Sequence, residues 1–243
     1  TRGAKSRSLL PGTNRKGVRK PPSCWKTEYL MQFDPALAKQ IAENLPAEVQ
    51  SILKRFPTKL MVAGGFVRDF LTEARPKDVD IFAITKGVLE EAWEEFWART
   101  EKYPFKKKTK NTVTFCSNDE LPKVQFIDKC FYPTAQALIE SFDFTICQSA
   151  IYWNGLQWVG VCTEAFWTDI CDWTAHYTAP QREEDPGASV LRMVKFARKG
   201  YEIPEDDIAR VVGRFHAVLS GRPEDEAVEA VRRSFSRIGY KDQ

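Results

Sequence analysis

The sequence predicts a mixed α/β (α+β) head, a central sheet with helices on one face, followed by a small helical neck. Three observations lead to this fold class. Residues 60–84 read as an apolar strand, a short helix and a second apolar strand. Beyond Pro186 the hydrophobic pattern is helical to the end of the chain. At 243 residues and 43% apolar content, the chain can bury one sizeable core and carry a helical appendage.

Hydrophobic periodicity and turn residues place the elements in order. The predicted helices cover 35–54 (as one helix or two), 66–71, 88–99, 134–140, 188–199, 205–219 and 224–238. The predicted strands cover 60–63, 78–84, 112–116, 124–128, 142–153 and 156–161. Asn154-Gly155, between the last two strands, predicts a type I′ hairpin turn, in which both central residues need a positive φ. The lysine-rich residues 106–110 are expected to form a solvated hairpin turn, with phosphate contact as the alternative.

Two carboxylates stand at alternate positions of one predicted strand. Asp78 and Asp80 should project to the same side of the sheet, because side chains alternate along a strand. Their hard oxygen atoms are suited to share one or two Mg²⁺ or Mn²⁺ ions. Such ions polarise an attacking hydroxyl and neutralise a leaving pyrophosphate, which is the electrostatic requirement of nucleotidyl transfer.

Gly64 and Gly65 separate the first predicted strand from the helix that follows it. Without Cβ atoms, their backbone can approach a triphosphate closely and direct its N–H groups toward the anion. Taken singly, a Gly-Gly step is typical of a turn, and Asp-x-Asp of a strand end. Their combination in strand, helix, strand order predicts a site for a nucleoside triphosphate (NTP) and a metal ion.

The stretch 64–80, GGFVRDFLTEARPKDVD, resembles the signature of the DNA polymerase beta-like nucleotidyltransferases. Within that superfamily it is similar to the motif GGxxRDxLxxxxxxDxD of the class II CCA-adding enzymes and bacterial-type poly(A) polymerases. Residues 141–148, SFDFTICQ, look like that family's RRDFTIN segment. Residues 191–203, LRMVKFARKGYEI, look like its LRAxRFA helix and the GFxI that follows. The three blocks keep their order and approximate spacing, so the resemblance spans residues 60–205.

The resemblance implies a metal-dependent enzyme that transfers a nucleoside monophosphate from an NTP to a hydroxyl. An RNA 3′ end is the favoured acceptor, and nucleotidylation of a small molecule is a related option. Asp78 and Asp80 would bind Mg²⁺ or Mn²⁺, and Asp143 would contact the ribose or the metal. The implied nucleotide-binding residues, which hold the triphosphate and shape its loop, are Gly64, Gly65, Arg68 and Asp69.

The sequence departs from the family pattern at several positions. Ser141 and Phe142 stand where the family has paired arginines, and residues 147–148 replace its Asn. The segment that matches the base-selecting EDxxR element keeps Glu184 and Asp185 but has no Arg at the matching position near Ser189. Gln125 stands where related transferases often carry a third carboxylate. These changes predict looser base selection and weaker NTP affinity. They also favour an alternative of a different class, a catalytically degenerate RNA-binding or assembly module within a larger viral-type precursor.

The basic composition sets apart an arm at 1–25, and the resemblance implies a nucleotidyltransferase head at 26–180 and a helical neck at 181–243. The arm has seven Lys and Arg residues and no acid within residues 1–23, so it is either a solvated tail or a segment that follows RNA phosphates. Six cysteines without CxxC spacing, and no membrane or secretory segment, predict a cytoplasmic, reducing environment, including that of a viral product in its host cell. The isolated His176 and His216 are expected to be ordinary hydrogen-bonded histidines.

Overall fold

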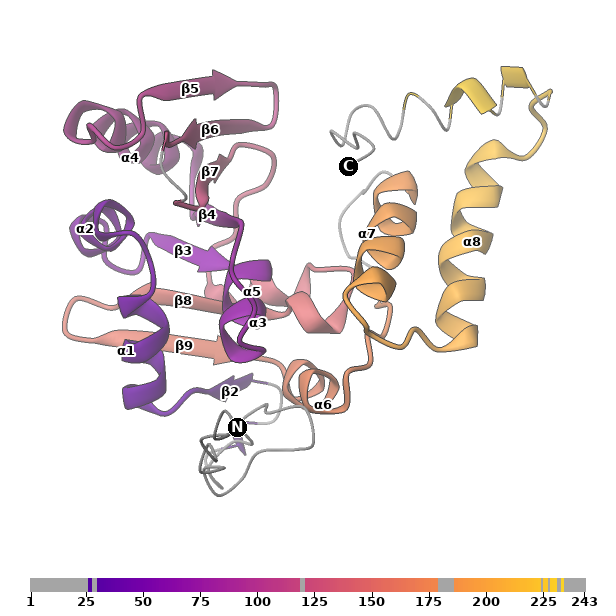
Figure 1. Cartoon of the computed structure of the whole chain (residues 1–243), viewed down its shortest axis with the longest axis horizontal. Helices are drawn as coiled ribbons and strands as arrows, with labels where there is room; N and C mark the ends of the chain where they lie inside the picture. The colour runs from indigo at the N-terminus through magenta and orange to yellow at the C-terminus, as the bar shows by residue number, and fades with distance from the viewer. Residues whose placement is uncertain are drawn as a thin grey trace, which may run out of the picture.

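One mixed sheet organises the computed structural model, which describes residues 26–27, 30–118, 121–178, 186–223, 225–226, 228–230 and 233. Within these residues nine strands pair in the order β1-β2-β9-β8-β3-β4-β7-β6-β5 (Figure 1). The strands are β1 Lys26–Thr27, β2 Leu30–Gln32, β3 Leu60–Ala63, β4 Asp78–Ala83, β5 Phe105–Lys108, β6 Thr112–Cys116, β7 Lys123–Ile127, β8 Ser149–Trp153 and β9 Trp158–Cys162. Only β4 and β7 are paired in parallel; the other described pairs are antiparallel.

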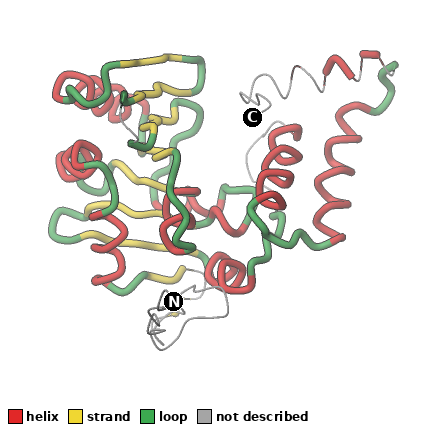
Figure 2. The backbone as a smooth tube through the Cα atoms, viewed as in Figure 1, coloured by secondary structure: helices red, strands yellow, loops and turns green. Residues whose placement is uncertain are grey.

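Helices surround this sheet and continue beyond it. They are α1 Pro35–Glu43, α2 Ala47–Arg55, α3 Gly65–Leu71, α4 Lys86–Arg99, α5 Ala135–Glu140, the 3₁₀ turn η1 Thr145–Cys147, α6 Glu164–Asp172, α7 Pro186–Arg198 and α8 Glu205–Leu219. Figure 2 shows the strands of the head close together, with α7 and α8 forming a separate pair of long helices at one side. None of the described helices is long and apolar enough to cross a membrane.

The two faces of the sheet carry different cores. On β3, Leu60 and Val62 join the larger core, which is built with α1 to α4, whereas Met61 and Ala63 join a smaller core beneath α5. The prediction that helices cover one face of the sheet therefore holds for α1 to α4, whereas the short α5 lies on the opposite face. α5 packs on β3, β8 and β9, and Ile127 of β7 also packs against the smaller core, whereas all four residues of the edge strand β5 are exposed.

The fold class predicted from the sequence, a mixed α/β head with helices after it, is confirmed. Two element predictions were wrong. Of the predicted strand 142–153 only Ser149–Trp153 is a strand, because residues 145–147 turn so that the Thr145 N–H can reach the carbonyl of His176 at 3.0 Å. Residues 106–110 were expected to form a turn, but Phe105–Lys108 is the edge strand β5 and pairs with β6.

The predicted type I′ turn was also wrong in its details. Gly155 has a φ of 101°, but Asn154 does not have a positive φ. The connection from β8 to β9 has four residues, and the Asn154 side chain stabilises it by accepting the N–H groups of Leu156 and Gln157, each at 2.8 Å. The backbone is paired across the turn by one bond, from the Asn154 N–H to the carbonyl of Gln157 at 3.1 Å, while the Gln157 N–H is taken by the Asn154 side chain.

The predicted boundary between head and neck at 180/181 lies among residues 179–185, outside the described part of the chain, so the division into domains stays a prediction. The arm at 1–25 also lies outside it, as does most of the predicted helix 224–238.

Candidate active site

The two carboxylates of β4 lie on the sheet face that α5 only partly covers. Val79 and Ile81 point into the larger core and are fully buried, so Asp78 and Asp80 project to the opposite side. The Oδ1 atom of Asp80 is buried and has no hydrogen-bond partner among the described residues. Burial, and then the negative charge of Asp78, raises the pKa of Asp80 to about 7.

This pair fits a hard divalent cation. A buried carboxylate oxygen without a donor is costly, and a bound cation removes that cost. Mg²⁺ is usually held by one or two carboxylates together with phosphate oxygens of a substrate and water. Asp78 and Asp80 provide such a pair, while no group of three or more His, Cys, Asp or Glu side chains that could hold a metal occurs within the described residues.

Gln125 occupies the place beside Asp80 where a third carboxylate was sought in the sequence. The parallel pairing of β4 and β7 sets Asp80 opposite Gln125. The amide nitrogen of Gln125 lies 3.5 Å from the hydroxyl of Thr114 on β6. An amide cannot accept a proton as a carboxylate does, so this neighbour offers no general base.

The glycine step connects β3 to α3 in a conformation that favours glycine. Gly64 has a φ of 83°, and its N–H donates to the carbonyl of Ser149 at 3.0 Å. The ring of Phe142 lies over Gly64, 3.7 Å from the position that a Cβ would take. Phe142 also packs edge-on against Phe82, with 5.8 Å between ring centroids. An apolar ring thus stands where the resembled family has an arginine, and the role of Gly64 and Gly65 toward a triphosphate stays a prediction.

Arg68 and Asp69 belong to a buried ion-pair network at the contact with α7. The Nε and Nη2 atoms of Arg68 donate to Asp69 Oδ1 at 2.9 and 2.8 Å. Lys199 donates to both oxygens of Asp69, at 2.9 and 3.0 Å. The Arg68 guanidinium also lies over the ring of Phe196, 5.2 Å from its centroid. These contacts bind the head to the neck, and the predicted role of Arg68 and Asp69 in holding the triphosphate is not tested by them.

Asp143 makes a second contact between head and neck. It is 1% exposed, and its Oδ2 accepts hydrogen bonds from Ser189 Oγ at 2.8 Å and from Arg192 Nε and Nη2 at 2.9 and 2.7 Å. A buried carboxylate held by a guanidinium and a hydroxyl is suited to fixing α7. The predicted contact of Asp143 with ribose or metal stays a prediction.

One side of α7, together with Lys199 directly after it, supplies the partners that sequence reasoning missed. Arg192 and Lys199 bind Asp143 and Asp69, and Lys195 lies near enough to Asp80 for its charge to oppose the rise in the pKa of that carboxyl, as does Arg68. Their positions, 192, 195 and 199, are three and four residues apart, which places them on one side of a helix. This spacing of basic residues is the feature of the sequence from which their shared side of the helix could have been predicted.

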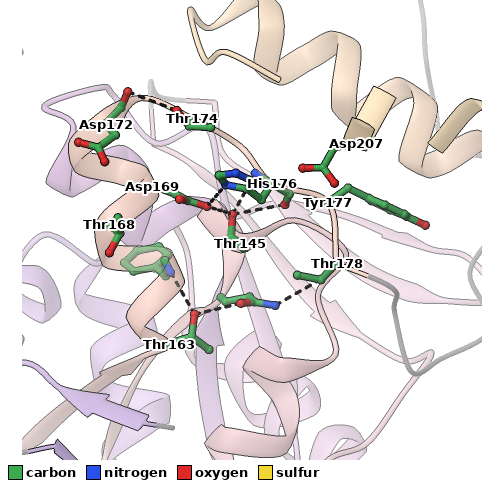
Figure 3. A network of polar contacts seen from close by, with 12 residues as sticks. Thr145, Thr163, Thr168, Asp169, Asp172, Thr174, His176, Tyr177, Thr178 and Asp207 are labelled. Atoms are coloured by element: carbon green, nitrogen blue, oxygen red, sulfur yellow. Dashed lines mark hydrogen bonds and ion pairs between the residues drawn. The ribbon is translucent and has the colours of Figure 1, made fainter. Parts of the chain in front are cut away.

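A polar network fixes the segment that follows Asp143 (Figure 3). Thr145 donates its hydroxyl hydrogen to Asp169 on α6, and the Nδ1 atom of His176 lies 2.9 Å from the same carboxylate oxygen. The His176 N–H donates to the Thr145 hydroxyl at 3.2 Å. His176 is therefore an ordinary hydrogen-bonded histidine, as predicted. The network holds η1 against α6 and so fixes the position of Asp143.

Solved structures similar to this chain include CCA-adding enzymes. A CCA-adding enzyme in complex with ATP is similar over 89% of this chain and 53% of its own, with a TM-score of 0.60 and 18% identity. The Thermotoga maritima CCA-adding enzyme complexed with tRNA is similar over 89% of this chain and 52% of its own, with a TM-score of 0.55 and 17% identity. The chain thus has the nucleotidyltransferase fold of CCA-adding enzymes. The narrower resemblance to the class II branch stays a prediction.

The chain belongs to the Gabija anti-defense 2 family, whose model matches residues 36–171. A curated relative, Gabija anti-defense 2 of Bacillus phage SPbetaL7, is 27% identical over 177 residues. That match covers 69% of this chain and 40% of the relative, so the chain spans well under half of the relative's length.

Proposed function

We propose that this protein is a metal-dependent nucleotidyltransferase that adds a nucleoside monophosphate from an NTP to a hydroxyl, with an RNA 3′ end as acceptor. The observation that carries the proposal is the Asp78 and Asp80 pair on one sheet face, with a buried Asp80 oxygen that has no protein partner among the described residues. A half-buried acid with a raised pKa beside a second acid is typical of a metal-binding or catalytic position. The CCA-adding fold supports the same chemistry.

In this proposal Asp78 and Asp80 hold Mg²⁺ or Mn²⁺, which would neutralise charge on the triphosphate and activate the attacking hydroxyl. Asp80 must lose its proton for this, so metal binding strengthens as the pH rises through about 7. Lys195 and Arg68 place positive charge near the carboxylates, where a triphosphate would also be attracted. The ion pairs of Asp69 with Lys199 and of Asp143 with Arg192 hold α7, and with it Lys195, in place.

The direct test is transfer itself. The protein is incubated with Mg²⁺ or Mn²⁺, each labelled NTP in turn and a panel of RNA 3′ ends, and extended RNA and released pyrophosphate are measured. We expect extension by the wild-type protein and none by Asp78→Ala or Asp80→Ala, with thermal unfolding showing that both variants fold. Turnover by the double alanine variant would contradict the assignment of the site.

Nucleotide choice offers a separate check on the neck. Bidentate arginine contacts give direction as well as energy. The sequence has no Arg at the position near Ser189 that matches the base-reading Arg of EDxxR, and no Arg pair directly before Asp143. We therefore expect weak discrimination among the four NTPs. Ordered use of CTP and then ATP would show that the neck motif had been misaligned.

A second candidate function is binding without catalysis, as a degenerate nucleotidyltransferase module. Gln125 beside Asp80 and Phe142 over Gly64 favour it, because an amide and an apolar ring replace groups that act on the nucleotide in related transferases. Both candidates are compatible with a counter-defence role, in which the chain acts as a viral product inside the host cell. The name of the phage relative supports that role.

One cellular experiment separates the two candidates. Cells that carry the Gabija defence are infected with a sensitive phage while they express the wild-type chain or the Asp78→Ala/Asp80→Ala variant. Restored plaque formation by the wild type but not by the variant supports the enzyme. Equal restoration by both supports the binding module, and restoration by neither argues against a counter-defence role for this chain.

A further inference from the structure

The edge strand β5 extends the face of the carboxylate pair across the sheet. Lys107 pairs with Thr114, Thr114 pairs with Gln125, and Gln125 pairs with Asp80. Directly paired residues project to the same side of a sheet. Lys107 therefore lies on the face of Asp80, three strand spacings or about 14 Å away.

Phe105 lies on the same face, two residues before Lys107. It pairs with Cys116, and Lys123 on β7 pairs with Asp78, so this second row runs parallel to the first. Phe105 is 57% exposed, which is unusual for so large an apolar ring. Lys107 and Lys123 are exposed beside it. This part of the face thus combines an accessible aromatic ring with two cations.

The other two lysines of β5 have a different environment. The ammonium groups of Lys106 and Lys108 lie over the ring of Trp93, at 5.0 and 5.3 Å from its centroid, on the face covered by α4. Lys106 also lies 5.0 Å from the centroid of Trp97. Alternation along one strand therefore separates lysines that contact tryptophans from a lysine that faces the candidate active site.

We infer that Phe105, Lys107 and Lys123 form a binding surface for the single-stranded 3′ segment of an RNA acceptor, with Phe105 stacking on a base and the two lysines binding phosphates. An aromatic ring flanked by cations is the combination that binds single strands without reading their sequence. All four residues of the edge strand β5 are exposed. The separation of about 14 Å corresponds to about four stacked nucleotides between Phe105 and the end that reacts.

The inference rests on the proposed function for its choice of ligand, and it is tested by binding alone. The affinity of a fluorescently labelled single-stranded RNA of twelve nucleotides is measured by anisotropy, with EDTA and without NTP, at several salt concentrations. Phe105→Ala should weaken binding about tenfold, because it removes a stacking platform. Lys107→Gln should weaken binding and lower the slope of log K against log salt by about 0.7, the value for one phosphate contact.

Lys108→Gln is the matched control. It removes the same charge from the same strand, but on the face of Trp93, and should leave affinity and slope unchanged. Thermal unfolding of each variant establishes that it is folded. Unchanged binding by Phe105→Ala, or equal losses in Lys107→Gln and Lys108→Gln, would overturn the inference, as would equally tight binding of duplex RNA.

Transfer activity, measured separately, distinguishes this inference from the proposed function. If the protein extends RNA but binds it equally well after Phe105→Ala, the proposed function stands and the binding surface is refuted. If the protein binds RNA through Phe105 but transfers no nucleotide, the binding surface stands and the proposed function is refuted.

Discussion

Replacing Asp80 with Asn should stabilise the metal-free protein at alkaline pH, although the residue belongs to the proposed site. Burial, and secondly the charge of Asp78, raises the pKa of Asp80 from 3.8 to about 7. Between these two values the folded chain holds a proton that the unfolded chain has lost. The unfolding free energy contributed by this group is therefore fully present below about pH 4 and is lost as the pH rises through about 7.

The size of the effect follows from the same shift. At 1.36 kcal/mol per pKa unit, ionising Asp80 in the folded protein costs about 4 kcal/mol if the carboxylate is completely shielded from water. The side chain is only half-buried, so solvent screens its charge and we expect about 2 kcal/mol. For a chain of this size that corresponds to a rise in Tm of about 5 °C in Asp80→Asn at pH 8.5.

The assay is urea unfolding of the wild-type protein and Asp80→Asn, with EDTA, at pH 4.5 and pH 8.5. The variant should gain stability mainly at the higher pH. Asp78→Asn is the comparison variant, because it removes only the second cause of the raised pKa of Asp80. Its pH-dependent loss of stability should shift to lower pH and persist.

Mg²⁺ provides the complementary measurement. Added at a hundred times its dissociation constant, it should stabilise the wild-type protein at pH 8.5 by about 2.7 kcal/mol, and Asp80→Asn much less. Equal stability of wild type and Asp80→Asn at pH 8.5 without metal would refute the argument that burial makes the ionised Asp80 costly in the folded protein.

Three further predictions concern packing, the neck and the arm. Gly160→Ala should lower the unfolding free energy by about 2 kcal/mol, because its Cβ would lie 2.2 Å from the Phe33 ring; an unchanged Tm would mean that the ring moves aside freely. Arg192→Met should cost about 3 kcal/mol in urea unfolding, because Asp143 remains buried without its cation, and adding Asp143→Asn should restore part of the loss. Deleting residues 1–23 should weaken RNA binding and reduce its salt slope by about 0.7 for each lost phosphate contact, whereas equal affinity and slope would identify a solvated tail.

Local rules were enough to predict much of the fold and the acidic pair. The strand, helix, strand order of residues 60–84 follows from hydrophobic runs and glycines that are close together in the chain. Asp78 and Asp80 share a face because side chains alternate along any strand, whatever its neighbours are. The helical pattern beyond Pro186 likewise followed from local spacing.

Elsewhere, contacts between segments far apart in the sequence give a secondary structure that differs from the predicted one. Residues 106–110 were expected in a loop because of their run of lysines, but residues 105–108 pair with β6, and Lys106 contacts the rings of Trp93 and Trp97, so they form a strand. Residues 145–147 have an apolar strand-like sequence, but hydrogen bonds to Asp169 and His176 hold them in a turn. In both cases partners from other elements outweighed the local preference.

The partners of the site residues were decided by the tertiary structure alone. Lys199 reaches Asp69 across 130 residues of sequence, and Arg192 reaches Asp143 across 49. The pKa of Asp80 depends on burial by segments far apart in the chain and on charges from β4, α3 and α7. A sequence determines which chemical groups are available and how they alternate, but burial and long-range charge depend on distances in space that only the folded chain sets.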